Sequence, residues 1–237
     1  MRSDMTKETL LEGIVQIYNH LVQGIDERAR ESNDRAYGGV IRASKGRLVE
    51  AIATLLVQAA WIDLGEPVDA LTFEHHTIKI PLRKGYLARI KDQRVREYVK
   101  ANIAEMHYRI KPDVQVYVNG EFRLSIECKA YTENAMLKRI LVDCTLIKHQ
   151  YPNVHFVLLQ LESQLGGDYS RVLQDVHYGS PATHTLLSYF DIDLDIITLL
   201  EGERKVDQPI HRKEFFKPLK SESLEKAVST LKKLLAN

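Results

Sequence analysis

The sequence predicts an α/β fold in which helices flank a central mixed β-sheet. Apolar residues recur near the 3.6-residue helical period in the N-terminal part of the chain, and the period changes to two from Tyr108 onwards. A short, nearly continuous apolar run follows at 154–159, which is typical of a buried strand. The 237 residues contain no repeat and no long linker, so we expect one domain, 1–237, with a core at roughly 45–200 and helical additions at both ends.

The N-terminal part is expected to form two helices. Residues 7–30 carry an apolar stripe, which consists of Leu10, Leu11, Ile14, Ile17, Tyr18 and Leu21. The Tyr37-Gly38-Gly39 segment interrupts this pattern, so a second helix is expected to begin at Ser44, a favourable N-cap residue, and to end near Leu64. Leu48, Ile52, Leu55 and Ala59 lie on one face of that helix.

The following elements are shorter. Residues 77–80 alternate like a strand, which Pro81 limits to an edge or an end, and residues 92–106 look helical. Further along the chain, strands are expected at 108–118, 121–131, 154–159 and 194–200, and helices at 133–149 and 224–235. Ser180-Pro181 has the pattern of an N-cap followed by proline at the first helical position.

The two strands around Asn119-Gly120 form the most informative segment, because this dipeptide between alternating runs is a strong hairpin signal. Even positions are apolar in both strands: Val114, Val116, Val118, Phe122, Leu124, Ile126 and Cys128. Odd positions are polar: Asp113, Gln115, Tyr117, Arg123, Ser125, Glu127 and Lys129. Each strand is therefore expected to have one buried face and one polar face.

The parity of these positions constrains the turn. Directly opposed residues point to the same face of a sheet. A plain two-residue loop would pair Val118 with Glu121 and would place the polar row of one strand on the apolar face of the other, which is costly. We therefore expect either a three-residue loop with Gly120 in a left-handed conformation or a β-bulge. Asp113, Glu127 and Lys129 then converge on one face.

Two carboxylates and one lysine on a sheet face suit metal-assisted phosphodiester hydrolysis. Carboxylates hold a hard divalent ion, which polarises a phosphoryl oxygen and acidifies a water molecule. The ammonium group can steady the attacking water or the charge on the phosphate. The alternative interpretation is a polar, solvent-facing sheet surface with a Glu–Lys pair, since Glu-x-Lys also occurs at Glu203-Arg204-Lys205.

Lys111-Pro112-Asp113, thirteen intervening residues and then Glu127-Cys128-Lys129 resemble the motif of the PD-(D/E)xK nucleases, and in particular of the type II restriction endonucleases. The resemblance covers roughly residues 45–160. It implies a restriction-endonuclease-like core in which Asp113 and Glu127 bind Mg²⁺, the backbone carbonyl of Cys128 adds a ligand, and Lys129 assists the water nucleophile. It also implies that Glu50, from an early core helix, lies beside the metal; a solvated helix carboxylate is the alternative.

Other basic residues are candidates for DNA contacts. Restriction enzymes often read bases just after the Glu-x-Lys strand, so the resemblance implies a DNA-binding role for Lys138 and Arg139, although surface helices carry such pairs routinely. Arg89, Lys91, Arg94 and Arg96 form a basic cluster that could contact phosphates; a charged helix face is the interpretation we favour. His75 and His76 lack partners at ligand spacing and are expected to be ordinary sheet or loop residues.

Composition excludes several other classes of protein. The formal net charge is only +1, which argues against a uniformly basic coat but not against a local basic cleft. The two cysteines form no Cys-x-x-Cys pair, which argues against a disulfide scaffold and the common zinc sites. No run approaches the 18 apolar residues of a membrane span, and the N-terminus lacks the pattern of a secretory signal, so a cytoplasmic location without membrane association is expected.

These observations favour a magnesium-dependent, sequence-specific endonuclease of double-stranded DNA, a type II restriction enzyme acting as a homodimer. Two-fold symmetry would match a palindromic site and place one active site on each strand. A repair or recombination nuclease with the same core is one alternative. A catalytically inactive DNA-binding protein that retains the sheet is the other.

Overall fold

The computed structural model describes residues 6–30, 34–170 and 178–236. Its main feature is a five-stranded sheet with the strand order β1-β4-β5-β6-β7. These strands are β1 (Leu71–Glu74), β4 (Val114–Val118), β5 (Glu121–Glu133), β6 (His155–Gln164) and β7 (Leu194–Thr198). The β1–β4 and β4–β5 pairs are antiparallel, whereas β5–β6 and β6–β7 are parallel. The sheet is therefore mixed, as the sequence predicts.

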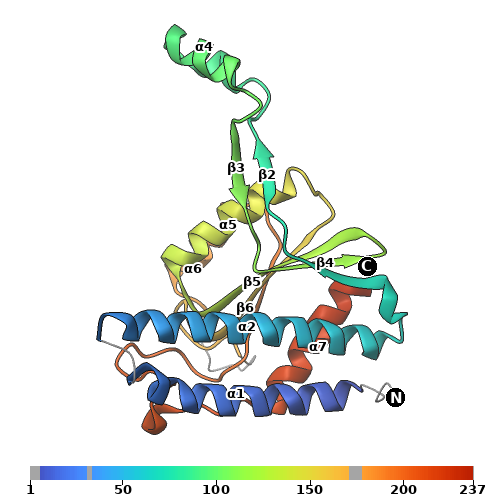
Figure 1. Ribbon diagram of the computed structural model, residues 1–237, viewed down its shortest axis with the longest axis vertical. Coiled ribbons are helices and arrows are strands. Elements are labelled where there is room, and N and C mark those ends of the chain that lie inside the picture. The colour runs from blue at the N-terminus through green and yellow to red at the C-terminus, as the bar shows by residue number, and fades with distance from the viewer. Residues whose placement is uncertain (1–5, 31–33, 171–177, 237) are drawn as a thin grey trace.

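Helices cover both faces of this sheet (Figure 1). One face packs against α2 (Asp34–Leu64) and α7 (Ser221–Ala236), with α1 (Lys7–Arg30) packed on the outer side of α2, and the other against α5 (Asn134–Lys148) and α6 (Pro181–Ser188). Short 3-10 helices lie at Val68–Ala70 and Lys213–Phe215. Each face has its own buried apolar cluster, which confirms the predicted α/β class. None of the helices among the described residues has the length and apolar character of a membrane span.

The first two helices differ from the prediction in detail. α2 begins at Asp34 rather than Ser44 and continues through Tyr37-Gly38-Gly39. Glycine costs a helix about 1 kcal/mol relative to alanine, but it does not by itself end one. In α1, Ile17 is 37% exposed although it belongs to the expected apolar stripe, and the side chain of Leu21 lies outside the described residues.

The β4–β5 hairpin resolves the question of parity with a bulge. Its turn has two residues, since Val118 pairs with Glu121, and both Asn119 (φ 52°) and Gly120 (φ 81°) are left-handed. The register then shifts between Val116 and Tyr117, so that Val116 pairs with Leu124 while Tyr117 pairs with Phe122. The bulge alternative is therefore confirmed and the three-residue loop is wrong.

The bulge has one consequence that alternation alone did not predict. Phe122 does not join the other even-numbered residues but lies on the opposite face, where its ring stacks on Tyr117 with centroids 5.1 Å apart. Gln115 and Ser125, expected on a polar face, are also buried, because α5 covers that side of the sheet. The polar face is therefore accessible only in part.

The expected strand at 108–118 is divided in two. Pro112 cannot donate a ladder hydrogen bond, and it lies between β3 (His107–Ile110) and β4. β3 instead pairs with β2 (Ile78–Pro81) in a separate two-stranded sheet, which carries α3 (Tyr86–Arg89) and α4 (Gln93–Ala101). The helix expected at 92–106 thus ends earlier, at Ala101.

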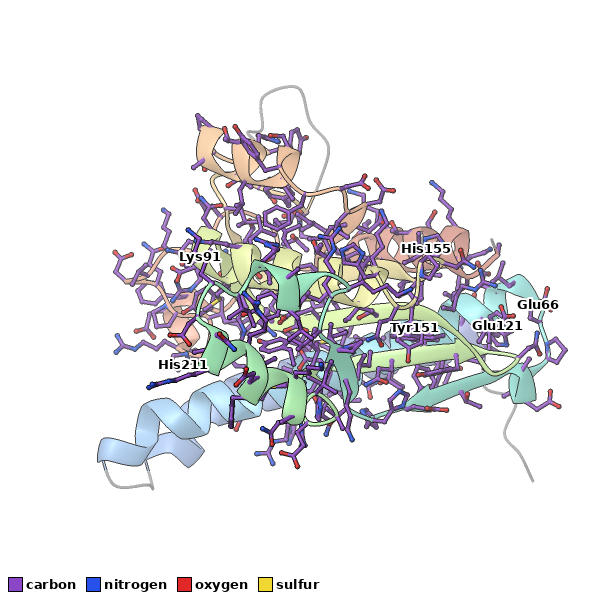
Figure 2. The ribbon with its side chains drawn as sticks, turned by 90° about the horizontal axis from the view of Figure 1, so that it is seen from above. Glu66, Lys91, Glu121, Tyr151, His155 and His211 are labelled. Atoms are coloured by element: carbon purple, nitrogen blue, oxygen red, sulfur yellow. The ribbon has the colours of Figure 1, made fainter. Side chains whose placement is uncertain are left out.

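Residues 78–110, named the arm below, project away from the helices and the main sheet (Figure 1). Figure 2 views the molecule from above, with Lys91 of the arm and Glu121 of the β4–β5 turn on opposite sides of the view. The rest of the chain follows the prediction more closely. The Ser180 side chain accepts a hydrogen bond from the Thr183 N–H, and Pro181 opens α6, so the predicted N-cap is confirmed.

Candidate active site

The Asp113, Glu127 and Lys129 side chains meet on the face of the sheet that α5 covers. Asp113 immediately precedes β4, and Val114 pairs with Ile126, so Asp113 and Glu127 are neighbours across the two strands. Lys129 follows two residues after Glu127 on β5 and therefore shares its face. The structure thus brings together the three side chains that the sequence singled out.

The Lys129 ammonium group makes three hydrogen bonds at the centre of this site. Its Nζ lies 3.0 Å from Asp113 Oδ2, 2.6 Å from Glu127 Oε1 and 3.0 Å from the Cys128 carbonyl oxygen. The Cys128 N–H also donates to Asp113 Oδ2, at 2.7 Å. The Cys128 side chain points the other way, into the apolar core. Three oxygen atoms from the expected metal ligands therefore surround one positive charge.

Burial and charge together shift the pKa values of this cluster. The Asp113, Glu127 and Lys129 side chains are 26%, 31% and 28% exposed. Burial raises the pKa of Glu127, with the Asp113 charge adding to the effect and Lys129 opposing it. Burial alone would lower the pKa of Lys129, but the charges of Glu127 and Asp113 outweigh it and the pKa is raised. Lys129 therefore stays positively charged over the physiological range.

Glu50 lies close to this cluster. It is half-buried on α2, where burial raises the pKa of its carboxyl group and the charge of Asp113 raises it further. The charges of Lys129, His75 and Lys111 act in the opposite direction. α2 thus places a third carboxylate within electrostatic reach of the site. His75 and Lys111, from the segments before β2 and after β3, act on the same carboxylate.

Lys138 and Arg139 lie on the exposed surface of α5. The Arg139 side chain is 83% exposed and its Nε lies 4.0 Å from the Asp143 carboxylate, one helical turn further on. Burial raises the pKa of Asp143, while the charges of Arg139 and Lys129 lower it. Asp143 therefore interacts electrostatically both with Arg139 on the α5 surface and with Lys129 in the candidate site. Asp143 was not predicted from the sequence; its four-residue spacing from Arg139 is the signal that could have indicated a helical pair.

A second polar network adjoins the site through Gln115, which precedes the bulge by one residue. The Gln115 amide donates to the His76 carbonyl oxygen at 2.6 Å. The His76 ring lies 2.8 Å from Glu74 Oε2 through Nδ1 and 3.1 Å from the Tyr117 hydroxyl through Nε2. His76 therefore lies in the loop between β1 and β2, as expected, and its spacing in the sequence did not predict these hydrogen-bond partners. These contacts hold the segment that carries His75 towards Glu50.

The donor set of the site fits a hard divalent cation. It consists of two carboxylates and one backbone carbonyl, the oxygen ligands that Mg²⁺ and Ca²⁺ prefer. Among the described residues no group of three or more His, Cys, Asp or Glu side chains is arranged to hold a metal ion by itself.

Comparison with known proteins decides the family. No protein-family model matches the sequence. The chain is, however, 45% identical over 231 residues to the type II restriction enzyme DdeI from Desulfomicrobium norvegicum (strain DSM 1741 / NCIMB 8310), an alignment that covers 95% of this chain and 96% of that protein. This chain belongs to the type II restriction enzymes. It is accordingly an endodeoxyribonuclease, and the resemblance inferred from the Asp113…Glu127-Cys128-Lys129 motif is confirmed at the level of the family.

A solved structure is also similar to this restriction enzyme along most of its length. The native BbvCI A2B2 tetramer aligns over 97% of this chain and 89% of its own, with 13% sequence identity and a TM-score of 0.37.

Proposed function

We propose that this restriction enzyme is a magnesium-dependent endonuclease that cuts double-stranded DNA at a specific sequence. The observation that carries the proposal is the convergence of Asp113, Glu127, the Cys128 carbonyl and Lys129 within hydrogen-bonding distance of one another. In this proposal Asp113, Glu127 and the Cys128 carbonyl hold the ion. When bound, Mg²⁺ supplies Lewis-acid polarisation of the phosphoryl oxygen and lowers the pKa of water.

The side chains of this chain have separate roles in the proposed reaction. Lys129, held positively charged by the two carboxylates, donates hydrogen bonds to the attacking water or to the phosphoryl oxygens as their negative charge grows. Glu50 adds a carboxylate from α2. Water attacks phosphorus, a P–O bond breaks, and the leaving oxygen takes up a proton. Lys138 and Arg139, exposed on α5, contact the DNA bases.

The proposal includes a homodimer in the cytoplasm. A two-fold symmetric dimer would present one site to each strand of a palindromic sequence. Both Cys128 and Cys144 are buried free thiols, which suits a reducing compartment. Light scattering of the purified protein tests the dimer: a mass of one chain at working concentration contradicts it.

A digest of sequenced plasmid DNA tests the activity. With Mg²⁺ we expect discrete fragments whose ends share one sequence, and with EDTA we expect intact plasmid. Fragments that persist in EDTA would contradict the magnesium dependence. Nicks that follow DNA structure rather than sequence would indicate the repair-nuclease alternative, and binding without cutting would indicate the inactive alternative.

A further inference from the structure

The arm has no buried residue along most of its length. Every residue from 81 to 109 is exposed or only half-buried, and neither α3 nor α4 contains a buried side chain. A segment of this length loses conformational entropy when it is ordered, and the burial of apolar surface usually offsets that cost. The arm lacks such burial within its own chain. Its amino-acid composition therefore indicates what kind of partner surface it binds.

The arm is strongly basic although the protein as a whole is not. It contains nine Lys or Arg and three Asp or Glu, which gives a formal charge of +6. Because the whole chain carries +1, the remainder carries −5. The nine cations are Lys79, Arg83, Lys84, Arg89, Lys91, Arg94, Arg96, Lys100 and Arg109. None of them forms an ion pair with a carboxylate that the structure describes.

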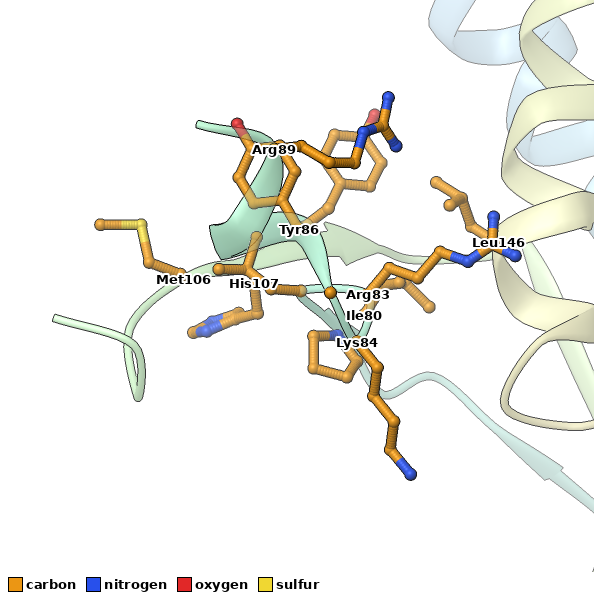
Figure 3. Close-up of a pocket in the computed structure, with 12 residues that line it drawn as sticks. Ile80, Arg83, Lys84, Tyr86, Arg89, Met106, His107 and Leu146 are labelled. Carbon is orange, nitrogen blue, oxygen red and sulfur yellow. The ribbon is translucent and has the colours of Figure 1, made fainter. Parts of the chain in front are cut away.

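Aromatic and apolar side chains lie among these cations. Of the ten large hydrophobic residues that are exposed in the described part of the chain, five belong to the arm: Tyr86, Val95, Tyr98, Ile103 and Tyr108. An open cavity of about 670 Å³ is lined by Tyr86 and Tyr108 together with Arg83, Lys84 and Arg89. Figure 3 shows Arg83 extending towards Leu146 of α5 while Lys84 extends away from it. Cations beside aromatic rings are characteristic of surfaces that bind nucleic acid.

Both ends of the arm arise at the candidate active site. Its last strand ends at Ile110, three residues before Asp113. Its first strand begins at Ile78, shortly after His75, whose charge acts on Glu50. A duplex with a phosphate at Lys129 must therefore pass the base of the arm.

We propose that the arm binds the phosphate backbone of the DNA duplex that is being cleaved and holds it against the active site. This inference rests on the proposed function, because it takes the same duplex as its ligand. Charge complementarity favours DNA over a second copy of the arm, since two arms would each bring a charge of +6 into contact. The acidic remainder of a second chain is the other possible occupant, and the experiment below separates the two.

The test compares two charge-neutralised variants with a matched control. Arg83→Gln/Lys84→Gln and Lys91→Gln/Arg94→Gln each remove two exposed charges from the arm. Lys226→Gln/Lys233→Gln removes two exposed charges from α7, which lies at the end of the molecule away from the arm (Figure 1). Affinity for a mixed-sequence 40-base-pair duplex is measured in EDTA between 50 and 200 mM salt. Thermal unfolding is measured on all four proteins to verify that they fold equally well.

Loss of a phosphate contact has a defined signature. Each lost contact reduces the slope of log affinity against log salt by about 0.9 and lowers affinity about five- to tenfold near 0.1 M salt. We expect such losses for both arm variants and an unchanged slope for the control. Equal slopes in arm and control variants would overturn the proposal.

Three further outcomes also decide the matter. Normal DNA binding by arm variants that lose mass in light scattering would assign the arm to contact between copies and would overturn the proposal. Wild-type protein that neither binds nor cuts DNA would overturn the proposed function itself. A wild-type enzyme that cuts plasmid normally while its arm variants keep the wild-type salt slope would overturn the role of the arm alone.

Discussion

The chain contains two Glu-x-Lys segments, and they have very different surroundings. Glu127-Cys128-Lys129 lies on the long strand β5, where both charged side chains share one face and meet Asp113 from the neighbouring strand. Glu203-Arg204-Lys205 lies in the connection after β7, where the Glu203 and Lys205 residues are exposed. Neither of these two side chains forms an ion pair with any other described residue.

The two segments share the Glu-x-Lys pattern but differ in whether a neighbouring strand supplies a partner side chain. In a regular strand, residues two apart point to the same side, so Glu127 and Lys129 converge and the opposite strand supplies Asp113. In the second segment the middle residue has the structural role instead. The Arg204 guanidinium lies 3.7 Å above the centroid of the Tyr131 ring. Of the two segments, the first therefore gains a second acid from a neighbouring strand, as the proposed metal site requires.

The largest expected effect separates these two segments directly. Lys129→Ala should reduce cleavage by at least about 10³-fold, because it removes the charge that orients the water or stabilises the phosphate. DNA binding, measured with Ca²⁺ in place of Mg²⁺, should change far less. Lys205→Ala is the matched control and should cut at the wild-type rate. Near-normal cutting by Lys129→Ala would show that Glu127-Cys128-Lys129 has no more role in cleavage than Glu203-Arg204-Lys205.

A smaller effect is expected at Glu50, the acid contributed from outside the hairpin. Glu50→Gln should reduce cleavage about 10- to 100-fold, less than the loss of Lys129, because Asp113 and Glu127 remain to hold the cation. Glu66→Gln, an exposed acid just beyond the end of α2, serves as control. The rates are compared over a titration of Mg²⁺. Rates equal to wild type at every Mg²⁺ concentration would show that Glu50 is a solvated helix carboxylate without a role in cleavage.

Much of the site could be predicted from the sequence because strand parity is a geometric constraint. The alternation of apolar and polar residues placed Asp113, Glu127 and Lys129 on one face and required an irregular hairpin. It could not locate the irregularity, since a loop and a bulge restore parity equally well. The bulge was decided by packing, which moved Phe122 to the face of Tyr117.

The parts that were missed depend on contacts distant in sequence. β1 has only four residues, and its pairing with β4 rather than a local pattern makes it a strand. The arm was not expected because the alternation from 108 to 118 predicted a single strand, whereas the chain forms two strands in different sheets on either side of Pro112. The partners of His76 come from Glu74 and Tyr117, and a spacing rule for metal ligands does not detect them.

A third prediction concerns recognition beside the first segment. Arg139→Ala should weaken binding to the correct site by about 1–3 kcal/mol more than binding to random DNA, as expected for a bidentate contact to guanine. A phosphate contact would weaken both equally. Affinities for specific and random duplexes are compared at one salt concentration, after the digest has identified the site. Equal losses on the two duplexes would remove Arg139 from base recognition.

The last prediction concerns stability and returns to the second segment, where Arg204 helps to lower the pKa of Lys45. The Lys45 ammonium lies 3.3 Å from His211 Nδ1. Burial lowers the pKa of Lys45 to about 8, a shift that Glu162 opposes and Arg204 reinforces. The unfolded chain has the ordinary lysine pKa of about 10.4. Folding therefore disfavours the charged form of Lys45, in contrast to Lys129, whose charge the neighbouring carboxylates favour.

The sign of the resulting pH dependence follows from these two pKa values. Below about pH 8 the side chain is charged in both states, so its burial destabilises the fold in full. Between about pH 8 and 10.4 the folded state loses the proton first, and this destabilisation fades as pH rises. Lys45→Met should therefore be more stable than wild type by about 1–3 kcal/mol at pH 7, with the difference shrinking towards pH 10. Denaturant unfolding at both pH values measures it, with Lys205→Met as the exposed control. A difference that stays constant or grows with pH would show that Lys45 is charged in the folded protein throughout, and the contrast with Lys129 would then disappear.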